Sequence, residues 1–207
     1  MGADRVMLVR HGESWWNAAG LWQGQQGPGL SDLGQRQAKV TAAFLAAHVD
    51  DAALLVSSDL ARVTETAEPA ARALGLPLRT DERLREIDVG WWSGLTTDEV
   101  LARAPGDMAA IRGGDDLPRG GAETVGDLRA RVAPAVAELA ASCDGGTTLI
   151  FSHGGPVRAI VGEALGLSII DERVLAGPDN CSRTVVTYRG GRPRLACYNE
   201  TAHLVGV

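Results

Sequence analysis

Lysine is almost absent from this sequence of 207 residues. Lys39 is the only lysine, and arginine supplies all the other positively charged side chains. The formal net charge is −6, and no block of basic residues occurs. The sequence therefore shows no electrostatic footprint for nucleic acid or for an anionic membrane. Any phosphate-binding site in this chain must be built from arginine and histidine.

Cysteine is also scarce, with only Cys143, Cys181 and Cys197, and no two of them form a C-x-x-C pair. An odd number at these spacings argues against a disulfide framework or a zinc site and fits a reducing compartment. The sequence has no apolar signal segment and no apolar run long enough to cross a bilayer. We expect a cytoplasmic protein with no membrane or nucleic-acid partner.

The length suits one domain, over residues 1–207, with a full-sized hydrophobic core. Short apolar runs rich in β-branched residues predict strands at Arg5–Arg10, Ala52–Ser57, Leu76–Thr80, Thr147–Ser152, Arg183–Arg189 and Pro193–Tyr198. Apolar residues at helical spacing predict helices from Ser31, as N-cap, to about His48, and at Ala61–Leu74, Glu123–Ser142 and Gly155–Leu165. This alternation predicts an α/β fold, a three-layer α/β/α sandwich around a mainly parallel sheet.

The segment at about 96–121 is the least regular part of the chain, with several glycines and prolines. We expect it to form a short, cap-like excursion over the edge of the sheet.

Two of the four histidines directly follow predicted strands, and each precedes glycine: Arg10-His11-Gly12 and Ser152-His153-Gly154. Either one alone could be a turn residue whose ring bonds to the main chain. In open α/β sheets, however, ligands bind outside the carboxyl ends of the strands, which is where both histidines are expected. The pair together indicates a functional site.

Further motifs follow these residues in a fixed order along nearly the whole chain. They read Leu8-Val-Arg-His-Gly-Glu-Ser14, Trp22-Gln-Gly24, Val56-Ser-Ser-Asp-Leu-Ala-Arg62-Val-Thr-Glu-Thr66-Ala67, Leu84-Arg-Glu86, Gly120-Gly-Ala-Glu123 and Ser152-His-Gly-Gly155. This set resembles the histidine phosphatase superfamily, which includes the cofactor-dependent phosphoglycerate mutases. The resemblance implies a phosphoglycerate mutase-like fold.

The resemblance also implies roles for individual residues. It makes His11 the nucleophile that carries a phosphoryl group, and Glu86 the proton donor. The phosphate pocket would consist of Arg10, Arg62 and His153, and a lining loop would contribute Asn17, Gln23 and Gly24, with Gly154 beside it.

The chemistry of these residue types supports such roles. A phosphomonoester is nearly a dianion, and arginine can neutralise it in place of Mg²⁺ because its planar fork pairs with two oxygens. No acidic cluster with metal-ligand spacing is visible, so we expect no metal and no cofactor. Neutral imidazole can then attack phosphorus, which splits hydrolysis into two steps.

Several of these residues have other interpretations. Arg62 could form a surface ion pair with Asp59 or Glu65, and Asp88 shares the loop of Glu86 and could be the acid instead. His48 is expected to be exposed, and His203 to have a structural role. The tryptophans lie beside the motifs and could line the pocket, pack, or form a homodimer contact: Trp15, Trp16, Trp22, Trp91 and Trp92.

Three functions fit this pattern: a phosphatase for a small phosphomonoester, a phosphomutase, and a non-catalytic binding domain on the same fold. All expected catalytic residues are present, which disfavours the third. A mutase needs a longer, more basic cover that excludes water, whereas residues 96–121 are few and carry more acids than arginines. The sequence favours the phosphatase. Sugar phosphates, phosphoglycerate derivatives, nucleotide-like phosphates and cofactor precursors all remain possible substrates.

Overall fold

The computed structural model describes residues 2–189 and 192–207, so residues 1 and 190–191 of the predicted domain lie outside the described residues. Its centre is a sheet with the strand order β3-β2-β4-β1-β5-β6. The first four strands in this order are parallel, whereas β5 and β6 run antiparallel to their neighbours. This confirms the mainly parallel sheet. The strands are β1 (Arg5–Arg10), β2 (Ala52–Ser57), β3 (Arg79–Thr80), β4 (Thr147–Ser152), β5 (Arg183–Arg189) and β6 (Arg192–Glu200).

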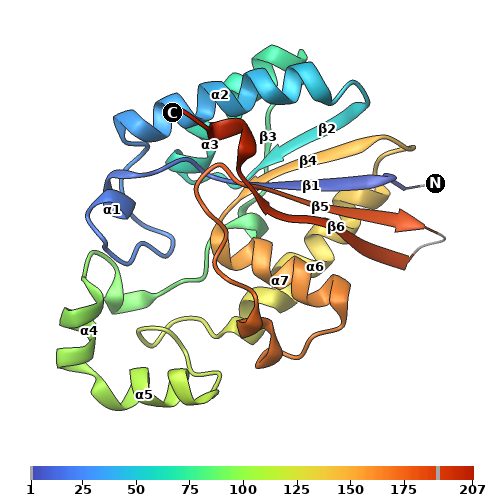
Figure 1. The fold of residues 1–207 in the computed structure, drawn as a ribbon. Coiled ribbons are helices and arrows are strands. Elements are labelled where there is room, and N and C mark those ends of the chain that lie inside the picture. Colours follow the sequence, from blue (N-terminus) through green and yellow to red (C-terminus); the bar gives the residue numbers. More distant parts are fainter. Residues whose placement is uncertain (1, 190–191) are drawn as a thin grey trace.

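Helices cover both faces of this sheet, which makes the three layers expected from the sequence. In Figure 1, α2 and α3 lie above the sheet, and α6 and α7 lie below it. Two short helices, α4 and α5, lie apart from the sheet, on the side where α1 follows β1 (Figure 1). The helices are α1 (Trp15–Ala18), α2 (Asp32–His48), α3 (Ala61–Leu74), α4 (Thr97–Arg103), α5 (Pro105–Gly113), α6 (Val125–Ala141) and α7 (Gly154–Leu165). Short 3-10 turns occur at η1 (Glu82–Leu84), η2 (Gly90–Trp92), η3 (Asp171–Val174) and η4 (Ala202–Leu204).

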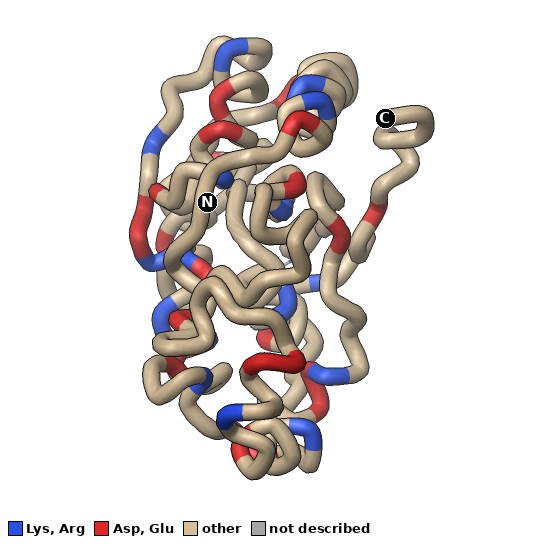
Figure 2. The backbone as a smooth tube through the Cα atoms, turned by 90° about the vertical axis from the view of Figure 1, so that its left-hand side faces the viewer, with Lys and Arg blue, Asp and Glu red and all other residues tan. Residues whose placement is uncertain are grey.

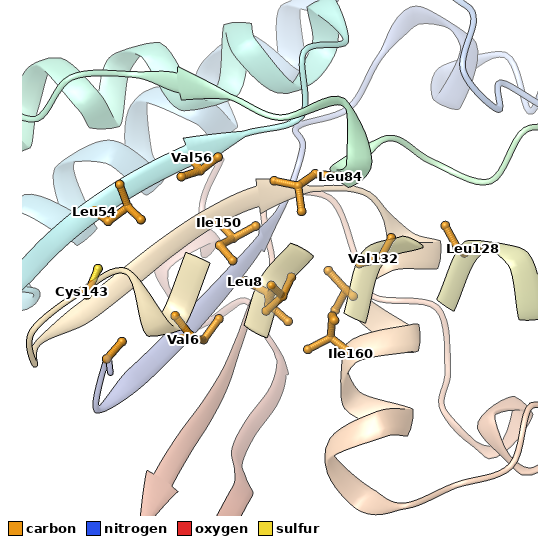
Figure 3. Packing of buried hydrophobic residues seen from close by; sticks show 14 residues of the cluster. Val6, Leu8, Leu54, Val56, Leu84, Leu128, Val132, Cys143, Ile150 and Ile160 are labelled. Atoms are coloured by element: carbon orange, nitrogen blue, oxygen red, sulfur yellow. The ribbon is translucent and has the colours of Figure 1, made fainter. Parts of the chain in front are cut away.

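The central strands are apolar on both sides because helices cover both faces of the sheet. Side chains alternate between the faces, so Val6 and Leu8 of β1 join one core cluster and Met7 and Val9 join the other. Figure 3 shows the first cluster, where Leu8 and Ile150 of the sheet pack against α6 and α7.

The helix ends follow local sequence signals. Ser31 caps α2 by accepting a hydrogen bond from Gly34 N at 3.1 Å, as its type and position predicted. Gly75 ends α3 in the left-handed conformation, with φ of 65°. Pro134 lies within α6, which continues through it.

The structure differs from the sequence prediction in two places. The strand predicted at Leu76–Thr80 pairs with β2 only through Arg79 and Thr80, because Leu76 and Leu78 pack against the core cluster instead. The excursion at about 96–121 is more regular than expected, since it contains α4 and α5.

Local sequence signals start both helices of the excursion. Thr96 and Glu99 form a capping box at α4, and Pro105 occupies the first turn of α5. A separate cluster of buried residues supports them: Val89, Trp92, Val100 and Met108.

The charged residues are spread over the molecule. Figure 2 shows basic and acidic positions interspersed along the backbone, without a long stretch of one sign on the face in view. Among the described residues, no helix combines the length and the apolar character that a membrane span requires.

The sheet register places the two histidine motifs side by side. β1 and β4 are adjacent and parallel, with Arg10 opposite Ser152, so both strands end at the same level. His11 continues this ladder by donating its main-chain N–H to Ser152 O at 2.9 Å. The residues after the two strands therefore meet at one edge of the sheet.

Candidate active site

His11 is held in one tautomer by its neighbours. Its side chain is only 2% exposed, and Nδ1 lies 2.7 Å from the carbonyl oxygen of Gly12. A carbonyl oxygen only accepts, so Nδ1 must carry the proton. Nε2 accepts a hydrogen bond from Nε of Arg62 at 3.3 Å, which requires its lone pair. His11 is thus neutral, with the unprotonated nitrogen directed at an arginine.

Arg62 lies in the first turn of α3, and only 2% of its surface is exposed. Two main-chain carbonyls fix its guanidinium, because NH1 donates to Gln26 O at 2.8 Å and NH2 donates to Gly24 O at 2.7 Å. Burial lowers its pKa to about 10, which leaves it charged at neutral pH; Glu86 opposes this shift and Arg10 adds to it.

His153 lies behind this arginine and is fully buried. Its Nδ1 accepts a hydrogen bond from NH2 of Arg62 at 3.2 Å, so Nε2 must carry the proton and donate to Oγ of Ser58 at 3.0 Å. The rings of His11 and His153 meet edge to face, with centroids 5.2 Å apart. His153 thus lies beside His11, and Ser58, which carries no sequence signal for this role, fixes its ring.

Both imidazoles are held neutral by their surroundings. Burial, followed by the positive charges of Arg10 and Arg62, lowers the pKa of His11 well below its ordinary value. Burial and the charge of Arg62 do the same to the pKa of His153, with smaller contributions from His11, Arg10 and Arg131. A neutral imidazole keeps the lone pair that a nucleophile needs.

Arg10 and Glu86 both approach the first residues of α7. Nε of Arg10 and Oε2 of Glu86 each lie 3.9 Å from the point that a Cβ of Gly154 would occupy. The Glu86 carboxylate accepts hydrogen bonds from Gly155 N at 3.1 Å and Ile87 N at 2.9 Å. A Cβ on Gly155 would stand 2.2 Å from Oε1 of Glu86, so only glycine permits this approach.

Among the described residues, the guanidinium of Arg10 makes fewer hydrogen bonds than that of Arg62. Its NH1 donates to the carbonyl of Pro178, and its buried Nε has no hydrogen-bond partner within the described part of the chain. Burial lowers the pKa of Arg10, and the carboxylates of Glu86 and Asp179 oppose that effect.

The other acid considered, Asp88, has a structural contact instead. Its carboxylate accepts the main-chain N–H of Gly90 at 2.9 Å, and it does not belong to the described residues that line the cavity. Geometry thus separates Glu86 from Asp88.

The loop after His11 brings its predicted residues to the same place. Asn17 lies in α1, and its side-chain Oδ1 accepts a hydrogen bond from the side-chain amide of Asn180 at 3.3 Å. The side-chain Oε1 of Gln23 accepts a hydrogen bond from the hydroxyl of Ser14 at 2.8 Å. Gly24 has φ of 54°, and a Cβ there would lie 2.7 Å from Val89, so this turn needs glycine.

A second segment, unforeseen from sequence, clamps the backbone of His11. Asn180 donates its side-chain amide to His11 O at 3.0 Å, and Cys181 N lies 3.1 Å from Arg10 O. Thr66 of α3 accepts from Gly12 N at 3.0 Å. The Thr66 position falls inside a motif, but Asn180 sits in an irregular stretch that gives no sequence signal.

These groups surround a cavity of about 500 Å³. Its lining includes all the predicted site residues except His153, which is fully buried and bound to Arg62. It also includes residues that sequence reasoning gave no role, among them Arg158, Glu172 and Pro178. Arg158 could have been found, because it follows Gly154 by four residues and shares its helix face.

The alternatives raised from sequence are now decided for several residues. Arg62 forms no surface ion pair, because Asp59 binds Arg85 and Glu65 accepts the N–H of Leu30. His48 is exposed, as expected, and stacks on Phe44. His203 contacts Thr41 and Phe44, away from the cavity.

The tryptophans have different surroundings. Trp22 lines the cavity and packs edge to face on the fully buried Trp92, with ring centroids 5.2 Å apart. Trp15 is 53% exposed and Trp91 is 42% exposed. The group therefore serves both as pocket wall and as packing.

No cluster of three or more metal-ligating side chains occurs among residues 2–189 and 192–207. The positive charge around the cavity comes from four arginines, Arg10, Arg62, Arg119 and Arg158.

Comparisons with known proteins agree with this arrangement. A sequence model of the histidine phosphatase superfamily (branch 1) matches residues 6–201. The glucosyl-3-phosphoglycerate phosphatase of Mycolicibacterium vanbaalenii is 39% identical, over 88% of this chain and 83% of that protein. Phosphoserine phosphatase 1 of Hydrogenobacter thermophilus is 33% identical, over 97% of this chain and 94% of that protein.

A solved structure of mycobacterial glucosyl-3-phosphoglycerate phosphatase, in complex with VO3, has a similar fold. The TM-score is 0.87 at 34% identity, covering 96% of this chain and all of that one. With the family model spanning nearly the whole chain, this protein belongs to the histidine phosphatase superfamily.

Proposed function

We propose that this protein is a metal-independent phosphatase that hydrolyses a small phosphomonoester through a phosphohistidine on Nε2 of His11. The tautomer of His11 carries this proposal. Nδ1–H is bound to Gly12 O, so the lone pair is on Nε2, which faces Arg62 at the edge of the cavity. In the first step the Nε2–P bond forms and the P–O bond to the leaving group breaks.

Arg10, Arg62 and His153 would bind the phosphoryl oxygens. Arg62 presents its Nε and NH2 to the two histidines, and a phosphoryl group between them could take over both donors. Neutral His153 has no proton on Nδ1, so it can donate to a phosphate oxygen only after taking up a proton. The dianionic phosphoryl group would favour that uptake by Coulomb attraction.

In its protonated form, which the second step restores, Glu86 would supply the proton for the leaving oxygen. In the second step, water attacks phosphorus as the N–P bond breaks, and Glu86 takes back a proton from that water. The carboxyl lies against Gly155 at the start of α7, across Gly154 from Arg10. Asn17, Gln23, Gly24 and Gly154 would shape the remaining wall.

We assign the chain to a single domain over residues 1–207 with a cap at about 96–121. The cap consists of two short helices on a small apolar cluster. Such a short cover admits water to the phosphohistidine, which favours hydrolysis over return of the phosphoryl group to the substrate. The three cysteines are free, which fits a cytoplasmic location.

The substrate proposed is a phosphoglycerate-type metabolite. Two relatives are named for glucosyl-3-phosphoglycerate and phosphoserine, and both compounds are phosphomonoesters that carry a carboxylate. The test is release of inorganic phosphate from a panel of phosphomonoesters, with 3-phosphoglycerate isomerisation assayed in parallel. His11→Ala is the control for contaminating phosphatase. Efficient isomerisation with little free phosphate would show a mutase, and no turnover of any phosphomonoester would contradict the enzyme assignment.

A further inference from the structure

Two arginines outside the phosphoryl pocket line the same cavity. Arg158 is in α7, and Arg119 is in the segment between α5 and α6. NH2 of Arg158 donates to the main-chain oxygen of Glu172 at 3.2 Å, and NH1 of Arg119 donates to the main-chain oxygen of Leu117. Each guanidinium is thus held in place by a neutral carbonyl.

Their lack of acidic partners distinguishes them from the other partly buried arginines outside the phosphoryl pocket. Over the described ranges, neither Arg119 nor Arg158 forms an ion pair with a carboxylate. Carboxylates do pair with Arg5, Arg83, Arg85, Arg129, Arg131 and Arg183. Burying two cations in one cavity raises the free energy of the folded protein unless an anion binds beside them.

Glu172 lines the cavity but does not provide that compensation. Its carboxylate is only 3% exposed and is paired with Arg129, which also donates to Leu167 O at 2.7 Å. This pair fixes the turn whose main-chain oxygen binds Arg158. The Glu172 carboxylate therefore neutralises Arg129 and not Arg158, so the guanidinium of Arg158 can form an ion pair with a bound ligand.

The two arginines line one cavity, and the charge of Arg158 acts on Arg119. Burial lowers the pKa of Arg119, Asp116 opposes this, and the charges of Arg173 and Arg158 lower it further. Arg173 is exposed and does not line the cavity, whereas Arg158 does.

Helix geometry gives the separation from the phosphoryl pocket. Arg158 follows Gly154 and Gly155 by about one turn of α7, which is roughly 5 Å along the axis. Arg158 lines the same cavity as the Glu86 carboxyl at Gly155, while its NH2 is held at the main-chain oxygen of Glu172. Apolar side chains of Leu128 and Ile111 line the cavity as well, and an apolar wall strengthens an ion pair.

We propose that Arg119 and Arg158 form a second anion subsite, which binds a carboxylate of the substrate a few bonds from its phosphoryl group. This inference rests on the proposed phosphatase function and specifies its substrate class. The carboxylate would accept from both guanidiniums while the phosphoryl group lies against His11.

The experiment compares substrates that differ only at the carboxylate. One pair is 3-phosphoglycerate and glycerol 3-phosphate, and the other is O-phosphoserine and O-phosphoethanolamine. The readout is the ratio of kcat/KM with the carboxylate to kcat/KM without it. We expect this ratio to exceed 10 in the unmodified protein and to fall by about 10- to 100-fold in Arg158→Gln and in Arg119→Gln, mainly through KM. Arg158→Lys should recover part of the loss.

Arg173→Gln is the matched control, since it removes a nearby exposed arginine that does not line the cavity, and its ratio should equal that of the unmodified protein. A ratio near 1 in the unmodified protein would overturn the subsite even if a variant fails to fold. Equal losses on both members of a substrate pair would also overturn it. Failure of the phosphatase proposal is a different result, namely no phosphate release from either member or from p-nitrophenyl phosphate.

Discussion

Lowering the pH from 7.5 to 5.5 should destabilise this protein through His11 and His153. Burial and the neighbouring arginines lower the pKa of both imidazoles well below 6.5, so the folded state keeps them neutral. The unfolded chain binds protons at both positions once the pH falls below about 6.5. Stability is therefore fully present above that value and is lost as the pH falls through it.

The size of the effect follows from the unfolded reference value of 6.5. At pH 5.5, one unit below it, proton binding by the unfolded state costs about 1.4 kcal/mol of folding free energy for each histidine. The pair together contributes about 3 kcal/mol, and almost none of this loss is present at pH 7.5. With a typical urea dependence of about 2 kcal/mol per molar, the unfolding midpoint should fall by roughly 1.5 M.

Other groups act in this window or just outside it. His203 has a pKa lowered to about 4 by burial and by the charge of Arg183, so it adds in the same direction, although solvent reaches this half-buried ring. The aspartates with lowered pKa values, Asp51, Asp59 and Asp81, lose their contributions only at more acidic pH. The range from 5.5 to 7.5 thus isolates the histidines.

The assay is urea unfolding followed by circular dichroism at several pH values. The double variant His11→Gln/His153→Gln should have a much flatter midpoint between pH 5.5 and 7.5, and His203→Gln measures the remaining contribution. An equally steep dependence in the double variant would refute the reasoning, because the destabilisation would then come from other groups.

Four further predictions concern catalysis. After a rapid quench, His11→Ala should carry no acid-labile, alkali-stable phosphoryl label, whereas the unmodified protein carries it on the His11 peptide; label elsewhere would contradict the mechanism. Glu86→Gln should lose about 10²- to 10⁴-fold in kcat/KM on alkyl phosphates and much less on p-nitrophenyl phosphate, because the nitrophenolate leaving group needs no proton. Burst kinetics would show which step limits the rate, and the same pattern in Asp88→Asn would assign the acid to Asp88. Binding of vanadate or phosphate should take up a proton through His153, seen by calorimetry in two buffers of different ionisation enthalpy and absent in His153→Gln; no difference between the buffers would argue against a charged His153. Activity should survive EDTA, and a loss that Mg²⁺ or Zn²⁺ restores would reveal a metal requirement.

The primary structure indicated the main residues of the site because they follow local sequence signals. β1 and β4 are buried on both faces, so they read as continuous apolar runs, and parallel strands end at the same edge of a sheet. That rule places His11 and His153 at one edge, and the pairing of β1 with β4 in the structure makes them neighbours. Arg62, Glu86 and the loop with Gly24 were found through motif order, which reflects the same fold.

The sequence did less well where structure depends on short or distant contacts. α1, α4 and α5 are too short for apolar periodicity to appear, and the helices at 97–113 depend on caps and on packing against Trp92. The predicted length of the edge strand β3 was too great, because an apolar run does not reveal how many of its residues pair with a neighbouring strand.

Only the tertiary structure decided the electrostatic state of the site. The tautomers of His11 and His153 depend on which carbonyl, hydroxyl and guanidinium groups face each ring, and these come from separate segments of the chain. The same holds for Arg119 and Arg158, which are 39 residues apart in sequence and acquire a common role by lining one cavity. Residue type and order set which chemistry was available, whereas hydrogen-bond direction and charge balance required the positions of all neighbours in space.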